Sequence, residues 1–554
     1  MEELFEVGIK GIVEFDNYPN GKVTLENNAI IIINEDNCKG LFHNDKIITK
    51  EDGLQVIERN IPFITGVLEL TSKIRYGYTK KGNHIINFKP LDFKHYPNFK
   101  VSTSLLRKKS ISITNKYCIV SFVKFDDKSI IPFGNIIEIL GNINDSSCYY
   151  KLVKYIHNIP MYKNPYKKFH PELPSPKPEQ YKKRPFFEAF SIDPEGCSDI
   201  DDCVSCNKVD GNYIVGVHIT DIWEYLTPET FVNASKQLSS IYNPDGSKYN
   251  MLPDILADDI CSLHENTVKP CLSVVLTFNN DKQFVSYNII ETYVKNTAKY
   301  TYNQVDKVFL TDEYFITLCH LLSNLVGNTI YDSHKLIEYL MIIANKFVGK
   351  WLTGKNIKHP IRIQPISKSN YDHVPKDIAI LMKTFNNEKA YYVDNNLETD
   401  DVYHHSLDVK DYTHFTSPIR RFVDIITHKL IKETLHNNKI MEYNYSDILV
   451  NINMFENILK RYYSDCNKIT ILFHVEKSGK TMVECVLINI DNNYGTIYIK
   501  EFDIYTKTKL YDIKMQALSG DMFNDKLYKT FTTQIHINHN EINPFRKLRF
   551  VINN

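Results

Sequence analysis

The spacing of apolar residues changes twice along this chain, and these changes limit the folds that it can adopt. Residues 1 to about 165 hold short apolar runs, such as 11–15 and 118–123, between turns rich in Asn, Gly, Asp and Lys. This pattern is typical of β-strands. From about 185 to 468 such runs alternate with long helical patterns, and strand patterns return from about 469 to 554. The sequence therefore predicts small β domains on both sides of a larger α+β domain.

The predicted β regions have the size of small barrels. The first 165 residues have room for two units of about 70–80 residues, and short strands interrupted by glycine are typical of OB-type barrels. A β-sandwich without a ligand is the alternative. Residues 481–490 and 496–500, joined by the turn 492–495, predict a hairpin of a third small barrel. The apolar stretch 336–352 is interrupted by polar residues and predicts a buried amphipathic helix.

Composition narrows the class of protein. The 554-residue chain has 66 Lys+Arg and 66 Asp+Glu, so any nucleic-acid footprint must be local. The N-terminus opens acidic without a long apolar core, and no apolar run approaches the roughly 18 residues of a membrane span. The 11 cysteines are scattered, and Cys203 and Cys206 form a CxxC without a second pair at zinc spacing. Strand packing is therefore favoured over zinc, and we expect free thiols, no membrane contact and a cytoplasmic location.

A basic stretch separates the first β region from the centre. Residues 151–184 hold nine lysines and arginines against Glu172 and Glu179. Prolines at 165, 171, 174, 176 and 178 stiffen the stretch. An extended connector is the prediction. It would either neutralise the backbone of a nucleic acid or serve as a solvated linker, and composition does not separate the two.

Four carboxylates gather in the segment 189–206. The strand pattern of 186–192 ends at Asp193, and Pro194 and Gly196 then predict a turn. Three further aspartates precede the next strand: Asp199, Asp201 and Asp202. After that strand, Asp210 and Gly211 predict the turn of a hairpin. Carboxylates held this close repel one another unless a cation neutralises them, and hard divalent cations are their usual partners. Two Mg²⁺ or Mn²⁺ ions could activate water at a phosphodiester. A solvated acidic turn or a calcium loop is the alternative.

Two arginines follow a helix-start signal in the segment 412–431. Ser417 is a good N-cap, Pro418 suits the first helical position, and apolar residues then recur at helical spacing. This predicts a helix with Arg420 and Arg421 in its first turn. Guanidinium groups beside free backbone N–H groups favour an anion such as phosphate. The alternative is an ion pair with Asp424 or with another domain.

These segments together resemble the ribonuclease II, or RNB, family. The carboxylate run IDPEGCSDIDD resembles the catalytic loop of that family, and GNYIVGVHITDIWEYL the strand that follows it. MLPDILADDICSL and YTHFTSPIRRFVDIITHKLI match two further blocks in the expected order. The N-terminal stretches 37–47, 87–97 and 132–141 resemble its cold-shock barrels.

The resemblance implies a multidomain architecture, with an α+β RNB catalytic domain flanked by OB-type β-barrels. The predicted domains are two cold-shock-like RNA-binding barrels at 1–80 and 81–165, the RNB domain at 166–468, and an S1-like barrel at 469–554. It also implies a processive 3′→5′ exoribonuclease that hydrolyses single-stranded RNA to nucleoside 5′-monophosphates with Mg²⁺, or Mn²⁺ as a substitute, in a two-metal mechanism.

Residue roles follow from the same resemblance. Asp193 and Asp202 would bind metal directly, Asp199 would support the site, and Asp201 would hold the second metal or orient the attacking water. Arg420 would stabilise the scissile phosphate. The expected RNA contacts are Tyr302, on which the 3′-terminal base stacks, and Tyr242, Arg421, Glu338 and Ser417. The sequence departs from the family where Tyr339 replaces the second of two adjacent glutamates, a change that concerns the choice of RNA over DNA.

Two other functions remain open from the sequence. One is a catalytically weak RNB-like protein that binds RNA without cutting it, and the other is a DNA exonuclease. Stable exosome tethering is not expected, because the chain shows no N-terminal endonuclease module, and we expect a monomer whose partner is single-stranded RNA.

Overall fold

The computed structural model describes most of the chain. The described residues are 7–59, 63–105, 114–126, 129–159, 183–366, 374–376, 378–379, 382, 389–395, 402–437, 445–479, 481–491, 494–511, 516 and 526–552. They divide into two compact units. One comprises Met1–Met161 and Ile458–Asn554, and the other comprises Tyr162–Asn457. None of the described helices is long and apolar enough to cross a membrane.

The N-terminal residues form two β-sheets. The first sheet has the order β3-β2-β1-β4-β5. The pairings of the second close a ring, β6-β8-β9-β11-β10, in which β9 and β11 are parallel. The strands are β1 Lys10–Asn17, β2 Asn20–Leu25, β3 Ile30–Ile33, β4 Lys46–Lys50, β5 Gly53–Glu58, β6 Ile64–Leu68, β7 Arg75–Tyr78, β8 His84–Pro90, β9 Phe99–Ser102, β10 Lys116–Asp126 and β11 Ser129–Asn142.

The second N-terminal sheet begins earlier in the chain than the predicted domain boundary after residue 80. β6 starts at Ile64 and pairs with β8 and β10, so residues 64–78 belong to the second sheet. These partners lie far along the sequence, and a local strand pattern does not show which strands pair. The domain limits themselves stay a prediction.

The predicted connector begins with a helix. Residues Tyr149–Ile156 form α1, which buries Tyr149, Leu152 and Val153 on one side, and Lys151 pairs with Glu138. The prediction of an extended chain from residue 151 is therefore wrong at its start, because this apolar face has a core to pack against. The other end, Arg184, is ion-paired. Residues 160–182 lie outside the described part of the chain.

The C-terminal residues form the closed barrel β23-β24-β25-β27-β26, in which β25 and β27 are parallel. Its strands are β23 Met482–Asp491, β24 Tyr494–Ile499, β25 Ile504–Tyr511, β26 Thr530–Ile537 and β27 Leu548–Ile552. This is the strand order of the ring in the second N-terminal sheet, and the predicted hairpin is confirmed. Helix α9, Ser446–Ser478, runs past the predicted boundary at 468/469.

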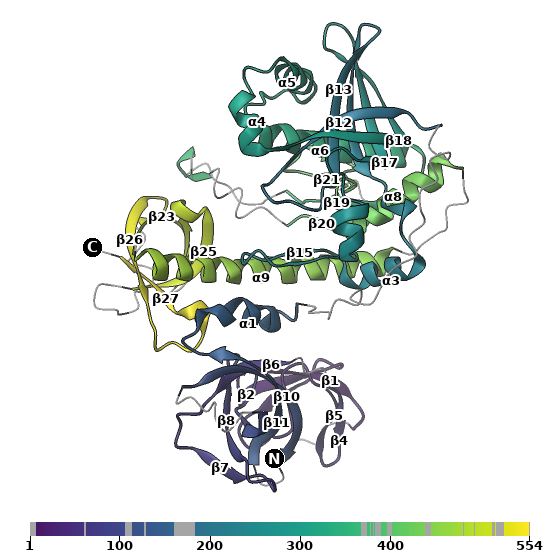
Figure 1. Cartoon of the computed structure of the whole chain (residues 1–554). Helices are drawn as coiled ribbons and strands as arrows, with labels where there is room; N and C mark the ends of the chain where they lie inside the picture. The colour runs from purple at the N-terminus through teal and green to yellow at the C-terminus, as the bar shows by residue number, and fades with distance from the viewer. Residues whose placement is uncertain are drawn as a thin grey trace. The chain divides into compact units, whose positions relative to one another are not determined.

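The central unit is built on the closed barrel β12-β13-β14-β17-β18 (Figure 1). Its strands are β12 Phe186–Asp193, β13 Asp202–Val209, β14 Asn212–Thr220, β17 Val268–Phe278 and β18 Phe284–Thr301. One continuous core joins the barrel to the helices, which are α3 Pro228–Gln237, α4 Tyr302–Val308, α5 Glu313–Val326, α6 Ser333–Gly354 and α8 Phe422–Leu435. Short pairs complete the unit: β15 Ile241–Tyr242 with β16 Lys248–Tyr249, β19 Pro360–Ile363 with β20 Tyr391–Asp394, and β21 Tyr403–His404 with β22 Val409–Lys410.

Several local predictions hold in this unit. Helix α6 contains the predicted apolar stretch, and β13 and β14 join at Asp210 and Gly211, both with positive φ. Cys203 and Cys206 lie three residues apart on β13 and pack into different apolar clusters, as strand alternation requires. All 11 cysteines are free thiols.

Candidate active site

The aspartate loop, residues 193–202, connects two strands of the central barrel. β12 ends at Asp193, a turn closes between Cys197 N and Pro194 O at 3.2 Å, and β13 begins at Asp202. Gly196 sits at φ +77° in this turn, a backbone conformation that glycine adopts without strain. Ile200 ties the loop down, because its N–H donates to Ser262 Oγ at 3.0 Å and its carbonyl accepts from Leu263 N at 3.0 Å. The four aspartates are thus held at one end of the barrel.

The arginine segment, residues 417–421, does not have the predicted helical form. Helix α8 begins at Phe422 with Arg421 as its N-cap, so Ser417 is not the N-cap and both arginines precede the helix. Tertiary pairing explains the difference. Arg420 O accepts from Ser240 N at 3.0 Å, and Phe422 N donates to Leu238 O at 2.9 Å, which holds Arg421 extended. Buried Asp424 accepts from Ser417 N and from Arg421 Nη2, each at 2.8 Å.

A pocket of about 510 Å³ brings the aspartate loop and the arginine segment together. Every residue that the sequence singled out for the site lines it: Asp193, Asp199, Asp201, Asp202, Tyr242, Tyr302, Glu338, Ser417, Arg420 and Arg421. Its wall also includes Met341, Ile342 and Asn345 of α6, with Tyr412 and His414. The residue roles assigned by resemblance stay a prediction, but these side chains share one cavity.

Asp201 is bound to the arginine segment through both of its carboxylate oxygens. Oδ1 accepts from Ile419 N at 2.9 Å, and Oδ2 accepts from Arg420 Nε at 3.2 Å. Burial raises the pKa of Asp201 to about 7, and Arg420 acts against this rise. Arg420 also donates to Ser417 Oγ at 2.9 Å, while 47% of its side chain stays exposed. The segment is thus anchored on one aspartate and still presents a cation.

Asp199 is also held by protein donors. Its Oδ1 lies 3.0 Å from Lys248 Nζ, and its Oδ2 accepts from the Tyr242 hydroxyl. Burial and the neighbouring Asp199 raise the pKa of Tyr242, so the phenol keeps its proton and donates. Sequence reasoning missed Lys248, which lies 49 residues along the chain from Asp199. Nothing in its immediate surroundings marks it as a site residue.

Asp193 and Asp202 differ from the other two aspartates. Within the described part of the chain, Asp193 Oδ2 is buried without a hydrogen-bond partner. Burial raises the pKa of Asp193, and burial together with the charges of Asp193 and Asp201 raises the pKa of Asp202 to about 8. A bound cation would neutralise two such carboxylates, and their hard oxygens suit Mg²⁺ or Mn²⁺. This pair fits a divalent metal ion.

Two further side chains that line the pocket are an aromatic ring and an exposed carboxylate. Tyr302 is the first residue of α4, and its ring stacks on His334 with centroids 3.8 Å apart and an angle of 6°. Glu338 of α6 pairs with Lys335 at 2.6 Å. About two turns further along α6, Asn345 is buried, donates to Tyr412 OH at 3.0 Å and accepts from Phe415 N at 2.8 Å. Tyr339 packs against the core and does not line the pocket.

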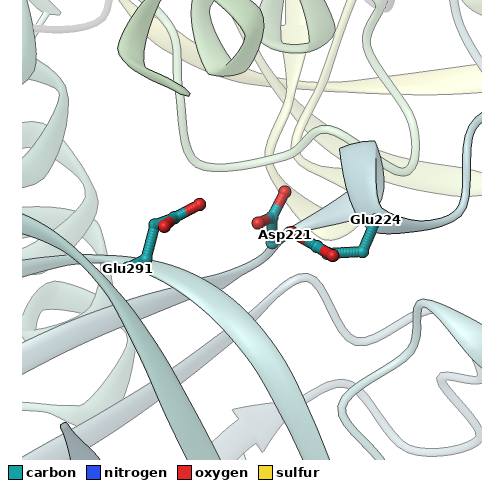
Figure 2. A group of neighbouring side chains, drawn as sticks. All are labelled: Asp221, Glu224 and Glu291. Atoms are coloured by element: carbon teal, nitrogen blue, oxygen red, sulfur yellow. The ribbon is translucent and has the colours of Figure 1, made fainter. Parts of the chain in front are cut away.

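A second acidic cluster lies elsewhere in the same unit, formed by Asp221, Glu224 and Glu291 (Figure 2). One oxygen of each lies within 4.8 Å of the others. The protein's own cations occupy this acidic trio. Lys432 Nζ lies 2.5 Å from Asp221 Oδ2 and 3.2 Å from Glu291 Oε1, and Arg184 Nη2 lies 2.9 Å from Glu224 Oε1. The trio is therefore an internal ion-pair network, and the scattered positions of its members gave no sequence signal.

Comparison with known proteins agrees with this architecture. The family model described as RNB domain matches residues 184–315 and 319–437, and the model of the Dis3-like cold-shock domain 2 (CSD2) matches 85–157. Ribonuclease R of Chlamydia muridarum (strain MoPn / Nigg) is 28% identical over 315 residues, which cover 44% of this chain and 45% of that protein. The chain thus matches less than half the length of this curated relative.

Solved structures share the fold over nearly the whole chain. Mycoplasma genitalium RNase R in complex with ribose methylated single-stranded RNA has a TM-score of 0.75 at 17% identity, covering 98% of this chain and 100% of that one. Yeast Ssd1, described as a pseudonuclease, has a TM-score of 0.63 at 17% identity, covering 90% and 79%. The architecture is an RNB domain with OB-type barrels, and the chain belongs to the RNB, or ribonuclease II, family.

Proposed function

We propose that this protein is a metal-dependent exoribonuclease that hydrolyses single-stranded RNA from its 3′ end to nucleoside 5′-monophosphates. The observation that carries the proposal is the single pocket in which the aspartate loop meets the arginine segment. Metal-binding carboxylates opposite a guanidinium are what hydrolysis of a phosphodiester requires. The related M. genitalium RNase R binds single-stranded RNA, which supports RNA as the substrate.

The chain's own residues divide the work. Arg420, fixed on Asp201 and Ser417 and still half exposed, would bind the scissile phosphate and stabilise its charge. Arg421 is tied to Asp424 and would mainly shape the segment. The free face of Tyr302 would support the 3′-terminal base, because His334 already covers the other face.

Asp193 and Asp202 would hold the divalent ion. When bound, such an ion polarises the phosphate and lowers the pKa of an attacking water. The sequence favours a two-metal mechanism. A second ion would need oxygens of Asp199 or Asp201, and protein donors already occupy these.

Selection of RNA over DNA would depend on the wall formed by α6. Glu338 is the carboxylate of that helix in the pocket, and the adjacent Tyr339 faces the core instead. A carboxylate that accepts from a ribose 2′-hydroxyl would favour RNA. We propose this contact for Glu338.

The test follows a labelled oligoribonucleotide in Mg²⁺. A 5′ label should appear on a ladder of shortening products, whereas a 3′ label should appear at once as mononucleotide. The same strand as DNA, and an RNA duplex with a 3′ overhang, measure the selectivity and the ability to unwind. Release of the 5′-labelled nucleotide first, or equal digestion of DNA, would contradict the proposal.

The second candidate is an RNB-like protein that binds RNA without cutting it. The fold that this chain shares with yeast Ssd1, a pseudonuclease, favours this candidate. The presence of all four aspartates and of Arg420 in one pocket opposes it. Retention of intact RNA at saturating Mg²⁺ and Mn²⁺ would decide for this candidate.

The expected setting is a cytoplasmic monomer that acts on single-stranded RNA without stable tethering to an exosome. Sedimentation of the purified chain, alone and with RNA, checks the oligomeric state.

A further inference from the structure

A short hairpin brings two donors to Asp199. Tyr242 of β15 and Lys248 of β16 are directly paired across this hairpin. Its turn is closed by Asn243 N to Ser247 O at 2.9 Å and by Gly246 N to Asn243 O at 2.9 Å. The two side chains therefore reach Asp199 together, the phenol at Oδ2 and the ammonium at Oδ1.

The Lys248 ammonium is fixed by acceptors from separate segments. It contacts Asp199 Oδ1 at 3.0 Å, Ser198 Oγ at 3.0 Å and Asp258 Oδ1. An ammonium has three N–H donors, and these acceptors match all three. Asp258 is itself oriented, because its Oδ2 accepts from Asn250 Nδ2 at 3.0 Å. With only 20% of its side chain exposed, Lys248 is held in one position by these acceptors.

The four aspartates of the pocket therefore form two pairs, one ion-paired with cationic side chains of the protein and one without such ion pairs among the described residues. Asp201 is neutralised by Arg420 and the Ile419 N–H, and Asp199 by Lys248 and Tyr242. Among the described aspartates that line the pocket, those without a lysine or arginine ion pair are Asp193, whose Oδ2 is buried without a partner, and Asp202. A divalent ion on Asp199 would meet the fixed positive charge of Lys248 at close range, and like charges there repel strongly.

We propose that Lys248 is a built-in monovalent cation that takes the place of a second divalent ion at Asp199. The site then binds one divalent ion, on Asp193 and Asp202, and Lys248 is a positioning residue that acts through Asp199. This inference rests on the proposed function and replaces the two-metal expectation from the sequence with a single-ion site.

The test counts ions. The purified full-length chain is titrated with Mn²⁺, alone and with a 2′-O-methylated oligoribonucleotide, and free Mn²⁺ is measured by electron paramagnetic resonance. We expect one ion per wild-type chain and two per Lys248→Met chain, because loss of the ammonium frees Asp199. Lys248→Arg keeps the charge and should bind one ion. Lys236→Met, an exposed lysine of α3, is the matched control and should also bind one.

The outcomes separate this inference from the proposed function. Zero or two ions on the wild-type chain, or one ion on Lys248→Met, overturns the inference. The ion count on the wild-type chain tests the inference by itself, so the test remains valid if the Lys248→Met chain does not fold. Asp258→Asn keeps Lys248 but removes one of the acceptors that hold its ammonium, so we expect this variant to bind a second ion more weakly.

A chain that binds one ion and releases no nucleotide contradicts the exoribonuclease and supports the single-ion site. A chain that degrades RNA with two bound ions contradicts the single-ion site alone.

Discussion

Two acidic clusters lie in the same unit of this protein, and they differ in what neutralises them. In the acidic trio, Lys432 and Arg184 reach all three carboxylates. In the aspartate loop, Asp199 and Asp201 have protein donors, whereas Asp193 keeps a buried oxygen without a described partner. Close packing of carboxylates alone therefore does not identify a metal site. The ion pairs separate the two clusters. Each carboxylate of the trio pairs with both Arg184 and Lys432, whereas Asp193 and Asp202 pair with no lysine or arginine among the described residues, and a buried charge needs such a partner.

The pKa directions show burial and nearby cations acting against each other. In the trio, burial raises the pKa of Asp221 to about 6 although Lys432 and Arg184 oppose the rise. Burial acts on Glu224, but Lys432 and Arg184 outweigh it and lower its pKa to about 2. At Asp202 burial and two neighbouring carboxylates act together and raise its pKa to about 8. A bound cation would favour the charged form of the carboxylates in the aspartate loop, as Lys432 favours the charged form of Glu224 in the trio.

The largest expected effect is that of Asp201→Asn. We expect hydrolysis to fall on the order of 10³-fold with RNA binding nearly unchanged, because this carboxylate positions Arg420 and serves the reaction more than the grip. Single-turnover rates and a binding titration measure the two effects. Asp210→Asn, an exposed turn residue with φ +48°, is the same chemical change outside the pocket and should be silent. A normal rate for Asp201→Asn would show that the role is wrongly assigned.

Lys432→Met should break the trio without touching the chemistry. Removing one partner of a buried ion-pair network costs about 3 kcal/mol, because carboxylates are left without their cation. Urea unfolding measures this loss, and the rate of hydrolysis per folded molecule should not change. Lys429→Met, one turn earlier on α8, should cost less, because Lys429 pairs with the single carboxylate of Glu433 at 3.8 Å, whereas Lys432 pairs with all three carboxylates of the trio.

Lys432→Met also tests whether the acidic trio can bind a metal ion once its lysine is removed. If cations of the chain are what keep metal out of the trio, Mn²⁺ should stabilise Lys432→Met more than it stabilises the wild type, and it should not do so for Lys429→Met. An equal effect of Mn²⁺ on Lys429→Met would contradict this reasoning.

Arg420→Ala should lower kcat by about 10²-fold and weaken RNA binding much less, because a guanidinium at the scissile phosphate acts mainly on the transition state. Arg420→Lys keeps a charge but loses the two-pronged donor, and an intermediate rate is expected. Separate measurement of kcat and KM distinguishes this from a binding role, in which KM alone would rise.

The smallest expected effect is a loss of stability at low pH that comes from His428, a buried histidine outside both acidic clusters. Burial lowers the pKa of His428 to about 3, and its ring bonds Phe415 O at 2.8 Å beneath the arginine segment. The unfolded residue titrates near 6.5, so below that pH the unfolded chain takes up a proton that the folded chain refuses. His428 therefore contributes a loss of stability as pH falls, on the order of 1–2 kcal/mol by pH 5, and buried His218, whose pKa burial also lowers to about 3, contributes in the same direction.

Unfolding at pH 7.5 and pH 5 checks this effect. The difference between the two values should shrink in His428→Gln and persist in His320→Gln, which alters an exposed histidine of α5. If Lys432→Met removed the acid sensitivity instead, the trio would be its source.

Much of the fold could be predicted because it depends on local patterns. Alternation along 186–192 and the Asp210–Gly211 turn gave strands and a hairpin, and the polar interruptions of 336–352 gave α6. The helix start at Ser417 was wrong because backbone pairing of residues 420–422 with 238–240 overrides a good capping signal. Local propensity cannot contain such a pairing.

The two motifs of the site could be found in the sequence, because the aspartates of one short loop and the two adjacent arginines are each contiguous. Lys248, and the question of which aspartate oxygens already have protein donors, came from the tertiary structure. Lys248 reaches Asp199 across 49 residues, and Ile419 and Arg420 reach Asp201 across more than 200. Charge compensation depends on distances of a few ångströms in space, and these are set by the closed barrel and its hairpin rather than by spacing along the chain.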